Sequence, residues 1–241
     1  MPVLLELRDI SKAIGGLLIL NQLSFSLAAG EALGVLGPNG AGKTTMLNLI
    51  AGDMLPTSGQ IFFDGQDVTT LPAYRRCRLG LARTYQIPRP FTGMTVYENV
   101  LVGATYSRRN GHDKPNTQAV CRDVLELTRL MEIRDVVAGN LGLLDRKRLE
   151  LARALATQPR LVLLDEVGGG LTDAEVGELL GMVSDIRARG VTIIWIEHIV
   201  HALVSAVDRI LAINFGSKLA EGLPQEILAS KAFQEIYLGI E

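Results

Sequence analysis

A glycine-rich segment at residues 37–45 carries the strongest chemical signal in the sequence. It fits the P-loop pattern G-x-x-x-x-G-K-[ST]. Glycines let backbone N–H groups turn toward phosphate oxygens, and a helix N-terminus adds partial positive charge. We therefore predict a site for nucleotide phosphates, in which Lys43 reaches the outer phosphates and Thr44 ligates Mg²⁺. The predicted nucleotide-binding residues are Gly37, Pro38, Asn39, Gly40, Ala41, Gly42, Lys43, Thr44 and Thr45.

Two adjacent carboxylates, Asp165 and Glu166, follow the apolar run at residues 161–164. Such a pair at the carboxyl end of a buried strand is costly unless it holds a metal or moves a proton. Asp165 is the candidate magnesium ligand, and Glu166 is the candidate base that polarises an attacking water. The pair could instead cap the following turn, but the P-loop upstream favours the catalytic interpretation.

A histidine, His198, follows the apolar run at residues 191–196 and Glu197. It therefore lies at the carboxyl end of another predicted strand, at the edge where ligands of α/β proteins bind. A lone histidine there is usually structural, but beside the other two motifs His198 is a candidate sensor of the terminal phosphate. We expect His201, one turn further on, to lie on a helix surface without a role.

These residues need elements that hold them, and the first third of the chain predicts short strands typical of an antiparallel sheet. The strands are expected at residues 4–10, 17–27, 31–36 and 60–63. The turn signal Asp64-Gly65 follows the last of them. The P-loop follows a strand and precedes a helix that begins near Lys43, which is the unit that holds phosphates.

The rest of the chain predicts a helical insert and then an alternation of helices and strands. Hydrophobic spacing is helical from about residue 88 to 140, and helices and strands alternate from Arg146 onward. The alternation implies a mostly parallel sheet covered by helices, hence an α/β fold. We expect one domain over 1–241, with a nucleotide-binding core at about 1–87 and 146–241 and a helical subdomain at about 88–145.

Composition excludes several other classes. A net charge of -2 offers no broad basic field, so we expect no nucleic-acid partner. Cys77 and Cys121 lie far apart without a CxxC motif, which argues against a disulfide framework and a zinc site. No export signal or apolar stretch of the roughly 20 residues that span a bilayer is visible. Any link to a membrane is therefore expected to run through a partner protein.

The chain resembles the ATPases of ABC transporters in the order of its motifs: GPNGAGKTT, RTYQ with Gln86, RKRLELARAL, LVLLDE, and WIEHIV with His198. It is also similar to the ATP-binding subunits of uptake systems for branched-chain amino acids and related solutes. That likeness lies in RTYQIPRPFTGMTVYENVLVG at 83–103 and in the ending EIYLG at 235–239. The resemblance implies an ABC-type P-loop ATPase with a mixed core sheet, an antiparallel β subdomain and a helical insert.

The resemblance also implies roles and partners. Gln86 would touch the magnesium or the water and report to the membrane subunit, acting beside Lys43, Glu166 and His198 in hydrolysis of Mg-ATP. The implied partners are transmembrane permease subunits, a second ATPase subunit and, indirectly, a solute-binding protein. The implied location is cytoplasmic, on the inner face of the cell membrane. Residues 169–173 would form the contact loop of a head-to-tail dimer.

Two departures from the family pattern are visible. Where the signature LSGGQ is usual, this chain has Leu141-Gly142-Leu143-Leu144-Asp145. The serine hydroxyl is missing, both glycines are replaced by leucines, and the glutamine is replaced by an acid that would lie near a phosphate. Asp145 could instead cap a helix that begins at Arg146. Ile14 replaces the usual aromatic that stacks on adenine. We therefore hypothesise a heterodimer with unequal sites, in which this chain's signature closes its partner's site poorly.

Other functions stay open. The altered signature would suit a nucleotide-binding switch with little turnover, although Glu166 and His198 are both present. A DNA-repair or translation protein is disfavoured, because no coiled-coil arm, zinc hook or second fused ATPase is visible. The ATPase of lipopolysaccharide export has a similar length and layout, but the neighbourhood of Gln86 favours uptake. Nothing in the chain identifies the solute, which other subunits contact.

Overall fold

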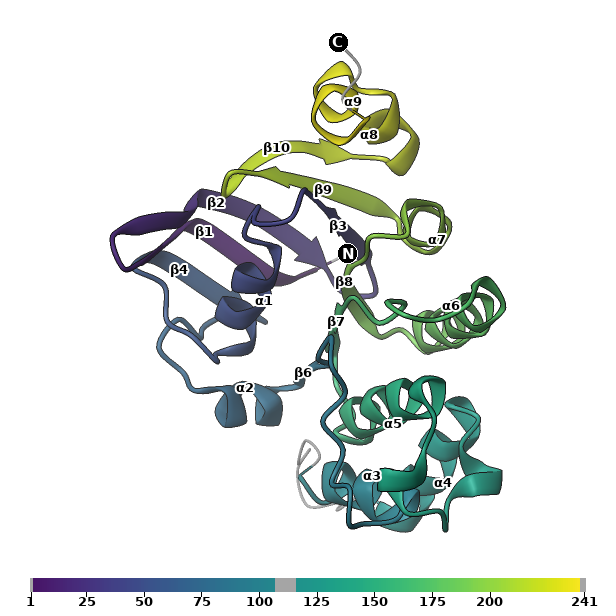
Figure 1. Ribbon diagram of the computed structural model, residues 1–241. Coiled ribbons are helices and arrows are strands. Elements are labelled where there is room, and N and C mark those ends of the chain that lie inside the picture. The colour runs from purple at the N-terminus through teal and green to yellow at the C-terminus, as the bar shows by residue number, and fades with distance from the viewer. Residues whose placement is uncertain (1, 107–115, 239–241) are drawn as a thin grey trace. The chain divides into compact units, whose positions relative to one another are not determined.

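The computed structural model describes residues 2–106 and 116–238, so the last residue of the EIYLG ending lies outside it. Contacts divide the chain into two compact units, Met1–Ala73 with Thr192–Glu241 and Tyr74–Val191 (Figure 1). The second unit contains the whole segment 88–145 that the sequence predicts as a helical subdomain, together with neighbouring strands and helices.

An antiparallel sheet opens the first unit, in the order β2-β1-β4-β5. Its strands are β1 (Val3–Ile14), β2 (Leu17–Ala28), β4 (Ser58–Phe63) and β5 (Gln66–Asp67). Leu5 pairs with Leu27 on one side and with Phe63 on the other, and all three side chains are buried. The antiparallel sheet predicted from the sequence is confirmed for residues 4–10, 17–27 and 60–63, but the predicted strand at 31–36 lies in the other set of strands, beside parallel neighbours.

A second set of strands in the same unit is mixed, with the order β10-β9-β3-β8. The strands are β3 (Ala32–Leu36), β8 (Thr192–Ile196), β9 (Arg209–Asn214) and β10 (Ser217–Gly222). β3 runs parallel to β8 and β9, whereas β10 is antiparallel to β9. β3 and β8 are buried along their whole lengths, as expected of parallel strands covered on both faces.

Short helices accompany these strands. They are α1 (Lys43–Ala51), α7 (Val200–Ala206), α8 (Pro224–Ala229) and α9 (Lys231–Leu238). α7 packs on β3 so closely that a Cβ on Gly34 would lie 3.0 Å from Leu203. Glycine at that position therefore lets the helix cover the strand that leads into the P-loop.

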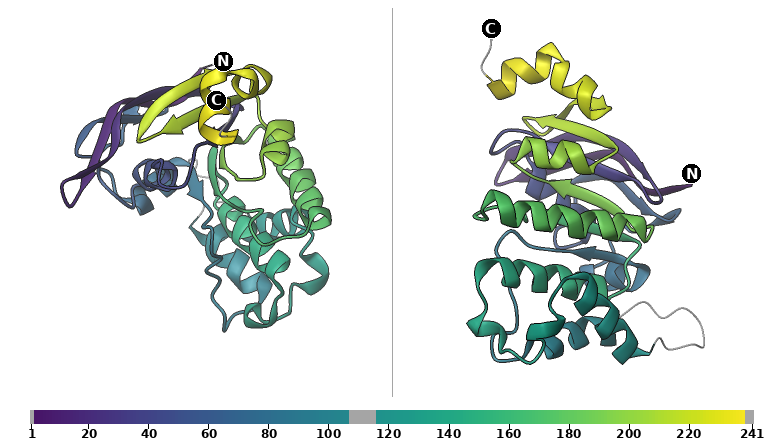
Figure 2. Two further views of the ribbon diagram at one scale, coloured as in Figure 1. Left: turned by 45° about the horizontal axis from the view of Figure 1, so that its top comes forward. Right: turned by 90° about the vertical axis from the view of Figure 1, so that its right-hand side faces the viewer.

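The second unit combines a parallel strand pair with helices. Its strands are β6 (Leu81–Arg83) and β7 (Leu161–Asp165). Its helices are α3 (Val96–Thr105), α4 (Thr117–Leu127), α5 (Leu143–Ala156) and α6 (Asp173–Ala188), and α2 (Ala73–Leu79) begins at its boundary. α3 packs on both α4 and α5. The two further views in Figure 2 show these helices, in teal, packed together.

Side-chain caps fix where three helices of the second unit, α3, α4 and α6, begin. Thr95 and Glu98 form a reciprocal capping box at the start of α3, and Thr172 and Glu175 form another at the start of α6. The side chain of Asn116 accepts from the first backbone N–H groups of α4. Among residues 2–106 and 116–238, no helix has the length and apolar content that a bilayer crossing requires.

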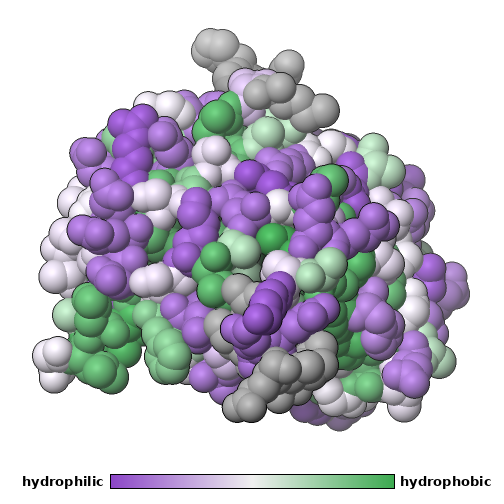
Figure 3. Space-filling view, turned by 90° about the horizontal axis from the view of Figure 1, so that it is seen from above, coloured by the Kyte–Doolittle hydropathy of each residue, from purple (hydrophilic) through white to green (hydrophobic). Residues whose placement is uncertain are grey.

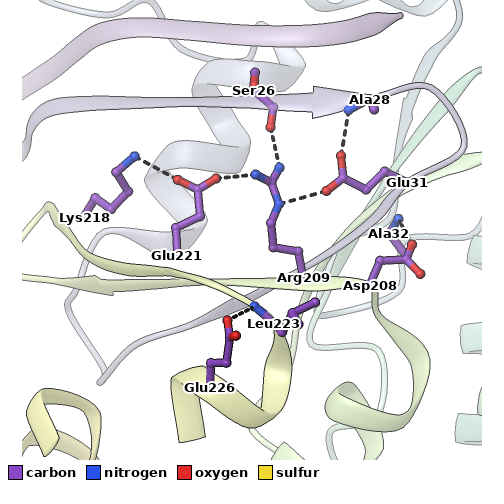
Figure 4. A network of polar contacts seen from close by, with 10 residues as sticks. All are labelled: Ser26, Ala28, Glu31, Ala32, Asp208, Arg209, Lys218, Glu221, Leu223 and Glu226. Atoms are coloured by element: carbon purple, nitrogen blue, oxygen red, sulfur yellow. Dashed lines mark hydrogen bonds and ion pairs between the residues drawn. The ribbon is translucent and has the colours of Figure 1, made fainter. Parts of the chain in front are cut away.

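A cluster of polar contacts centred on Arg209 joins the two sets of strands in the first unit (Figure 4). The Arg209 guanidinium lies 2.9 Å from Glu31 and 2.9 Å from Glu221, and it donates to the Ser26 carbonyl at 2.6 Å. Glu221 also pairs with Lys218 at 2.8 Å. One side chain of β9 therefore ties the end of β2, the start of β3 and β10 together.

Candidate active site

The P-loop connects β3 to α1 in the first unit, where the sequence predicts it. Lys43 begins the helix and is almost completely buried, and its ammonium donates to the carbonyls of Gly37 at 2.6 Å and Pro38 at 3.0 Å. The side chain thus points back over its own loop. An ammonium held there by backbone carbonyls is poised to exchange them for phosphate oxygens.

Two glycines of the loop are required by close packing. A Cβ on Gly37 would collide with the carbonyl oxygen of Ile213, and one on Gly42 would lie 2.9 Å from the carbonyl oxygen of Ile19. Gly42 also has φ +97°, a conformation that favours glycine. Gly42 precedes α1 as its N-cap and supplies no side-chain cap. Backbone geometry therefore keeps this helix N-terminus available to an anion.

The remaining P-loop residues differ in exposure. Ala41 is buried, whereas Asn39 and Gly40 are exposed. Thr44 is exposed at the start of α1, where its hydroxyl can serve as an oxygen ligand, and Thr45 is half-buried. The structure therefore presents one face of the loop to solvent.

His198 follows β8, also in the first unit. Its side chain is exposed, and its backbone N–H donates to the buried Glu197 carboxylate at 3.0 Å. That contact fixes the chain just after the strand. His201 is exposed on α7, the position expected of a helix-surface residue.

The acidic pair ends β7 in the second unit, as predicted. Asp165 is only 2% exposed, and its carboxylate lies 3.0 Å from the guanidinium of Arg83 on β6. Glu166 has φ +48°, a left-handed conformation that is unusual for a residue with a long side chain. The turn after Asp165 thus directs the two neighbouring carboxylates differently.

Gln86 lies against Glu166, so the structure brings two of the predicted catalytic residues together. The amide nitrogen of Gln86 donates to the Glu166 carboxylate at 2.5 Å. Lys147 on α5 donates to the backbone carbonyl of Glu166 at 3.4 Å. The candidate base is therefore held through its side chain and its backbone.

Arg83 was not recognised in the sequence as a site residue. The available signal was its place in RTYQ, directly before the loop that carries Gln86, on a strand parallel to β7. Its guanidinium also lies 4.9 Å from the ring centre of Tyr85, and Arg89 lies 5.2 Å from the same ring. The segment from Arg83 to Gln86 therefore contacts both members of the acidic pair.

The loop continues onto α5 through Arg89. The backbone N–H of Arg89 donates to Glu150 at 3.3 Å, and its carbonyl accepts from Arg153 at 2.6 Å. Burial raises the pKa of Glu150 above its ordinary value, and the neighbouring Arg153 guanidinium opposes this shift. These contacts anchor the end of the Gln86 loop to the helix of the signature segment.

The signature segment forms the start of α5, and one prediction about it is wrong. The helix begins at Leu143 rather than Arg146, with Gly142 as N-cap, so Asp145 lies inside the first turn and does not cap the helix. Asp145 instead pairs with Arg148 at 3.0 Å, and Arg148 also pairs with Glu178 on α6. A negative charge in the first helical turn is favourable in itself.

The predicted dimer-contact loop lies beside this segment. Gly169, Gly170, Thr172 and Asp173 are exposed. A Cβ on Gly170 would lie 3.3 Å from the side chain of Leu143, which is 46% exposed. The loop and the altered signature therefore form one continuous surface of the second unit.

Ile14 ends β1 at the tip of the hairpin with β2, where it pairs with Leu17. Ile14, Leu17 and Leu18 are 48%, 66% and 52% exposed. Figure 3 shows hydrophobic side chains gathered at the lower left of the view, over this hairpin tip. An apolar but non-aromatic surface thus stands where the resemblance implies stacking on a base.

The candidate metal ligands fit magnesium by their chemistry. Thr44, Gln86 and Asp165 offer a hydroxyl, an amide and a carboxylate, and Mg²⁺ prefers such oxygen ligands together with substrate phosphates. The Asp165 carboxylate is almost fully buried and lies 3.0 Å from the Arg83 guanidinium. Each of the three side chains therefore offers an oxygen of the kind that magnesium prefers.

Comparisons with known proteins agree with this set of motifs. The family model described as ABC transporter matches residues 20–168. The high-affinity branched-chain amino acid transport ATP-binding protein LivG of Escherichia coli is 35% identical, over 98% of this chain and 98% of its own. The lipopolysaccharide export system ATP-binding protein LptB of Acidithiobacillus ferridurans is 34% identical, over 99% and 98%.

Solved structures give the same result. A nucleotide-free ATP-binding cassette from an ABC transporter has a TM-score of 0.88 and 27% identity, covering 99% of this chain and 100% of its own. The ADP conformation of an ATP-binding cassette of an ABC transporter has a TM-score of 0.88 and 28% identity, covering 100% of both chains. The predicted fold is therefore confirmed.

Proposed function

Because the chain belongs to the ABC transporter family, we propose that it binds and hydrolyses ATP as the subunit that powers a membrane transporter. The observation that carries the proposal is the contact of Gln86 with Glu166, directly beside Asp165. A protein that only bound ATP would not need a held carboxylate next to a metal ligand. The contact therefore favours turnover over a binding switch.

The proposed reaction is in-line attack of water on the γ-phosphate of Mg-ATP. Lys43 and the loop N–H groups offset phosphate charge, and Glu166 orients the water and accepts its proton. His198, exposed at the end of β8, acts as the hydrogen-bonding sensor of the terminal phosphate. The bond from the γ-phosphorus to the bridging oxygen breaks, and ADP leaves with phosphate.

Magnesium would be held by Thr44 and Asp165, with Gln86 as a further contact. When bound, the ion neutralises developing charge on the phosphate oxygens. The exposed hydroxyl of Thr44 and the buried carboxylate of Asp165 are oxygen donors of the kind it prefers. Gln86 contacts Glu166, so a change at Glu166 when it engages water would be passed to the Gln86 loop, which would thereby report the nucleotide state.

A surface beside this loop would receive the permease. Ile87, Phe91, Met94 and Val137 are 73%, 43%, 40% and 40% exposed in the second unit. Met94 and Val137 are neighbours, because the N–H of Ala138 donates to the Met94 carbonyl at 2.8 Å. Exposed apolar residues that gather in this way mark protein contacts. The subunit would thus lie on the cytoplasmic face of the membrane, held there by its permease.

The proposed transport is uptake of branched-chain amino acids or a related small solute. The sequence from 83 to 103 and the similarity to LivG support it. Lipopolysaccharide export is the second candidate, because LptB matches over an equal share of the chain. A solute-binding protein would take part only indirectly, through the permease.

The proposed working form is a dimer of two ATPase subunits, with a heterodimer favoured. Leu143 and Leu144 replace small residues of the usual signature, and Asp145 adds an acid. The pairing of Asp145 with Arg148 offsets part of that charge, but the side chains of the two leucines remain. This chain would then supply a complete P-loop and acidic pair to a partner with an intact signature.

Glu166→Gln is the variant that tests the proposed chemistry. The amide keeps the shape of the side chain and can still accept from Gln86 through its oxygen, but it cannot accept the proton of water. We expect ATP binding to persist and turnover to fall by about 10²- to 10⁴-fold. Phosphate release and binding of a fluorescent ATP analogue measure the two quantities. Turnover that survives the substitution would contradict the role of Glu166.

A further inference from the structure

Arg83 and Asp165 form an ion pair that is shielded from water. Their charged groups lie 3.0 Å apart, and the two side chains are only 6% and 3% exposed. The pair joins neighbouring parallel strands, because Arg83 on β6 lies in register with Leu163 on β7. At this depth a charge needs a partner, since solvation by water is lost.

The backbone around Arg83 is fixed to the same strand. The backbone N–H of Thr84 donates to the Leu163 carbonyl at 2.9 Å, and its hydroxyl accepts from the N–H of Asp165 at 3.4 Å. The Tyr85 ring lies 4.9 Å from the Arg83 guanidinium carbon. Side-chain rotation could therefore separate the ion pair while these strand contacts stay in place.

We propose that Arg83 is a positioning residue that holds the Asp165 carboxylate in the metal-free protein and competes with Mg²⁺ for it. This inference rests on the proposed function, in which Asp165 is a magnesium ligand. A carboxylate already paired with a guanidinium carries less charge toward a second cation, and two cations on one carboxylate repel each other. Arg83 thus raises the magnesium concentration that the site requires.

The competition has a structural purpose. Without Arg83, the buried Asp165 carboxylate would lose the guanidinium that lies 3.0 Å away and would be held less firmly at the end of β7. Arg83 prevents this, so the ligand keeps its place between rounds of nucleotide binding. When Mg-ATP arrives, the displaced guanidinium remains close to the Tyr85 ring and can return after the metal leaves.

Arg83→Gln tests the competition. The Mg²⁺ dependence of methylanthraniloyl-ATP binding would be measured in a Glu166→Gln background, so that turnover does not interfere. We expect the magnesium concentration at half-saturation to fall by about 3- to 10-fold. The unfolding temperature of the metal-free protein should also fall, because Asp165 loses the guanidinium that lies 3.0 Å from it.

Arg89→Gln is the matched control. Arg89 also lies over the Tyr85 ring, at 5.2 Å, but its hydrogen bonds with Glu150 and Arg153 use backbone atoms that the substitution keeps. Its magnesium dependence should equal that of the parent. Arg83→Lys should fall between parent and Arg83→Gln, and it provides the test if the glutamine variant fails to fold.

The outcomes separate this inference from the proposed function. Suppose that Asp165→Asn raises the half-saturating magnesium concentration, while Arg83→Gln and Arg83→Lys have the same value as the parent. The proposed competition is then refuted, but Asp165 is still supported as a magnesium ligand. If Asp165→Asn leaves the dependence unchanged, Asp165 is not a magnesium ligand and both proposals fail. A rise in the half-saturating concentration in the Arg83 variants would also overturn the inference, because Arg83 would then assist the metal.

Discussion

Ile14 stands at an exposed hairpin tip and offers an aliphatic surface where the family resemblance implies an aromatic ring. An aliphatic side chain can contact a base but gives no ring stacking. If the hairpin tip receives the adenine, a single side chain limits how tightly this protein binds nucleotide. The neighbours Leu17 and Leu18 are exposed as well and share that apolar surface.

Ile14→Tyr is therefore expected to strengthen ATP binding by about 2- to 12-fold, the range given by an aromatic contact of about 0.5–1.5 kcal/mol. Titration with a fluorescent ATP analogue measures the change. Leu18→Tyr, on the facing strand of the same hairpin, is the control and should leave the affinity unchanged. Equal gains from both substitutions would indicate a general effect of aromatic residues on the tip.

At the scale of elements, Arg209 connects strands that lie far apart along the chain. It reaches Glu31, Glu221 and the Ser26 carbonyl, and its side chain is 29% exposed. Arg209→Met should lower the free energy of unfolding by about 1–3 kcal/mol, because two half-buried carboxylates lose a charged donor. Denaturant unfolding followed by circular dichroism measures this loss.

Arg8→Met is the comparison for that experiment. Arg8 pairs with Glu6 at 2.8 Å, but the two side chains are 55% and 35% exposed, so water screens the pair. Its removal should lower the free energy of unfolding by much less than the loss of Arg209 does. Equal losses from the two substitutions would mean that the Arg209 cluster contributes no more than an exposed pair.

Elements with a strong local pattern could be predicted from the sequence. Four elements lie at the predicted positions because an apolar run stands next to a turn or a motif in each case: β3, α1, β7 and β8. The β9–β10 hairpin, α2, α8 and α9 were not identified. The start of α5 was misplaced because Gly142 caps it through backbone conformation, without the side chain that usually marks an N-cap.

The residues of the candidate site also fall into two groups, those that a local sequence motif predicts and those that only the structure identifies. Lys43, Asp165 and Glu166 follow from motifs that require those residue types at those positions. Arg83 could not be found in this way, because its importance comes from the pairing of β6 with β7, which joins residues far apart in the chain. Its assignment needed the contact with Asp165, which no local pattern encodes.

At the scale of the whole molecule, the altered signature predicts that this chain works poorly as a homodimer. The purified chain should release little phosphate alone and gain activity when mixed with an ATPase partner that carries an intact signature. Lys43→Ala should then reduce the activity of the mixture by about 100-fold or more, while the matching change in the partner should reduce it less. Phosphate release and light scattering measure turnover and dimer formation.

Two results would count against unequal sites. Full activity of the chain alone would show that Leu141-Gly142-Leu143-Leu144-Asp145 is a working signature. Equal loss of activity from the two lysine substitutions would show that both sites contribute alike. Either result would leave the assignment of the P-loop and the acidic pair unchanged.

At Glu166, the left-handed backbone conformation lowers the stability of the fold, while the side chain is the proposed catalytic base. A non-glycine residue in this conformation costs about 1–2 kcal/mol, and a glycine there would remove the strain together with the carboxylate. Selection for a more robust fold would thus favour loss of the base, whereas selection for turnover retains it. A glutamate in this backbone state thus gives up folding free energy that a glycine at the same position would recover.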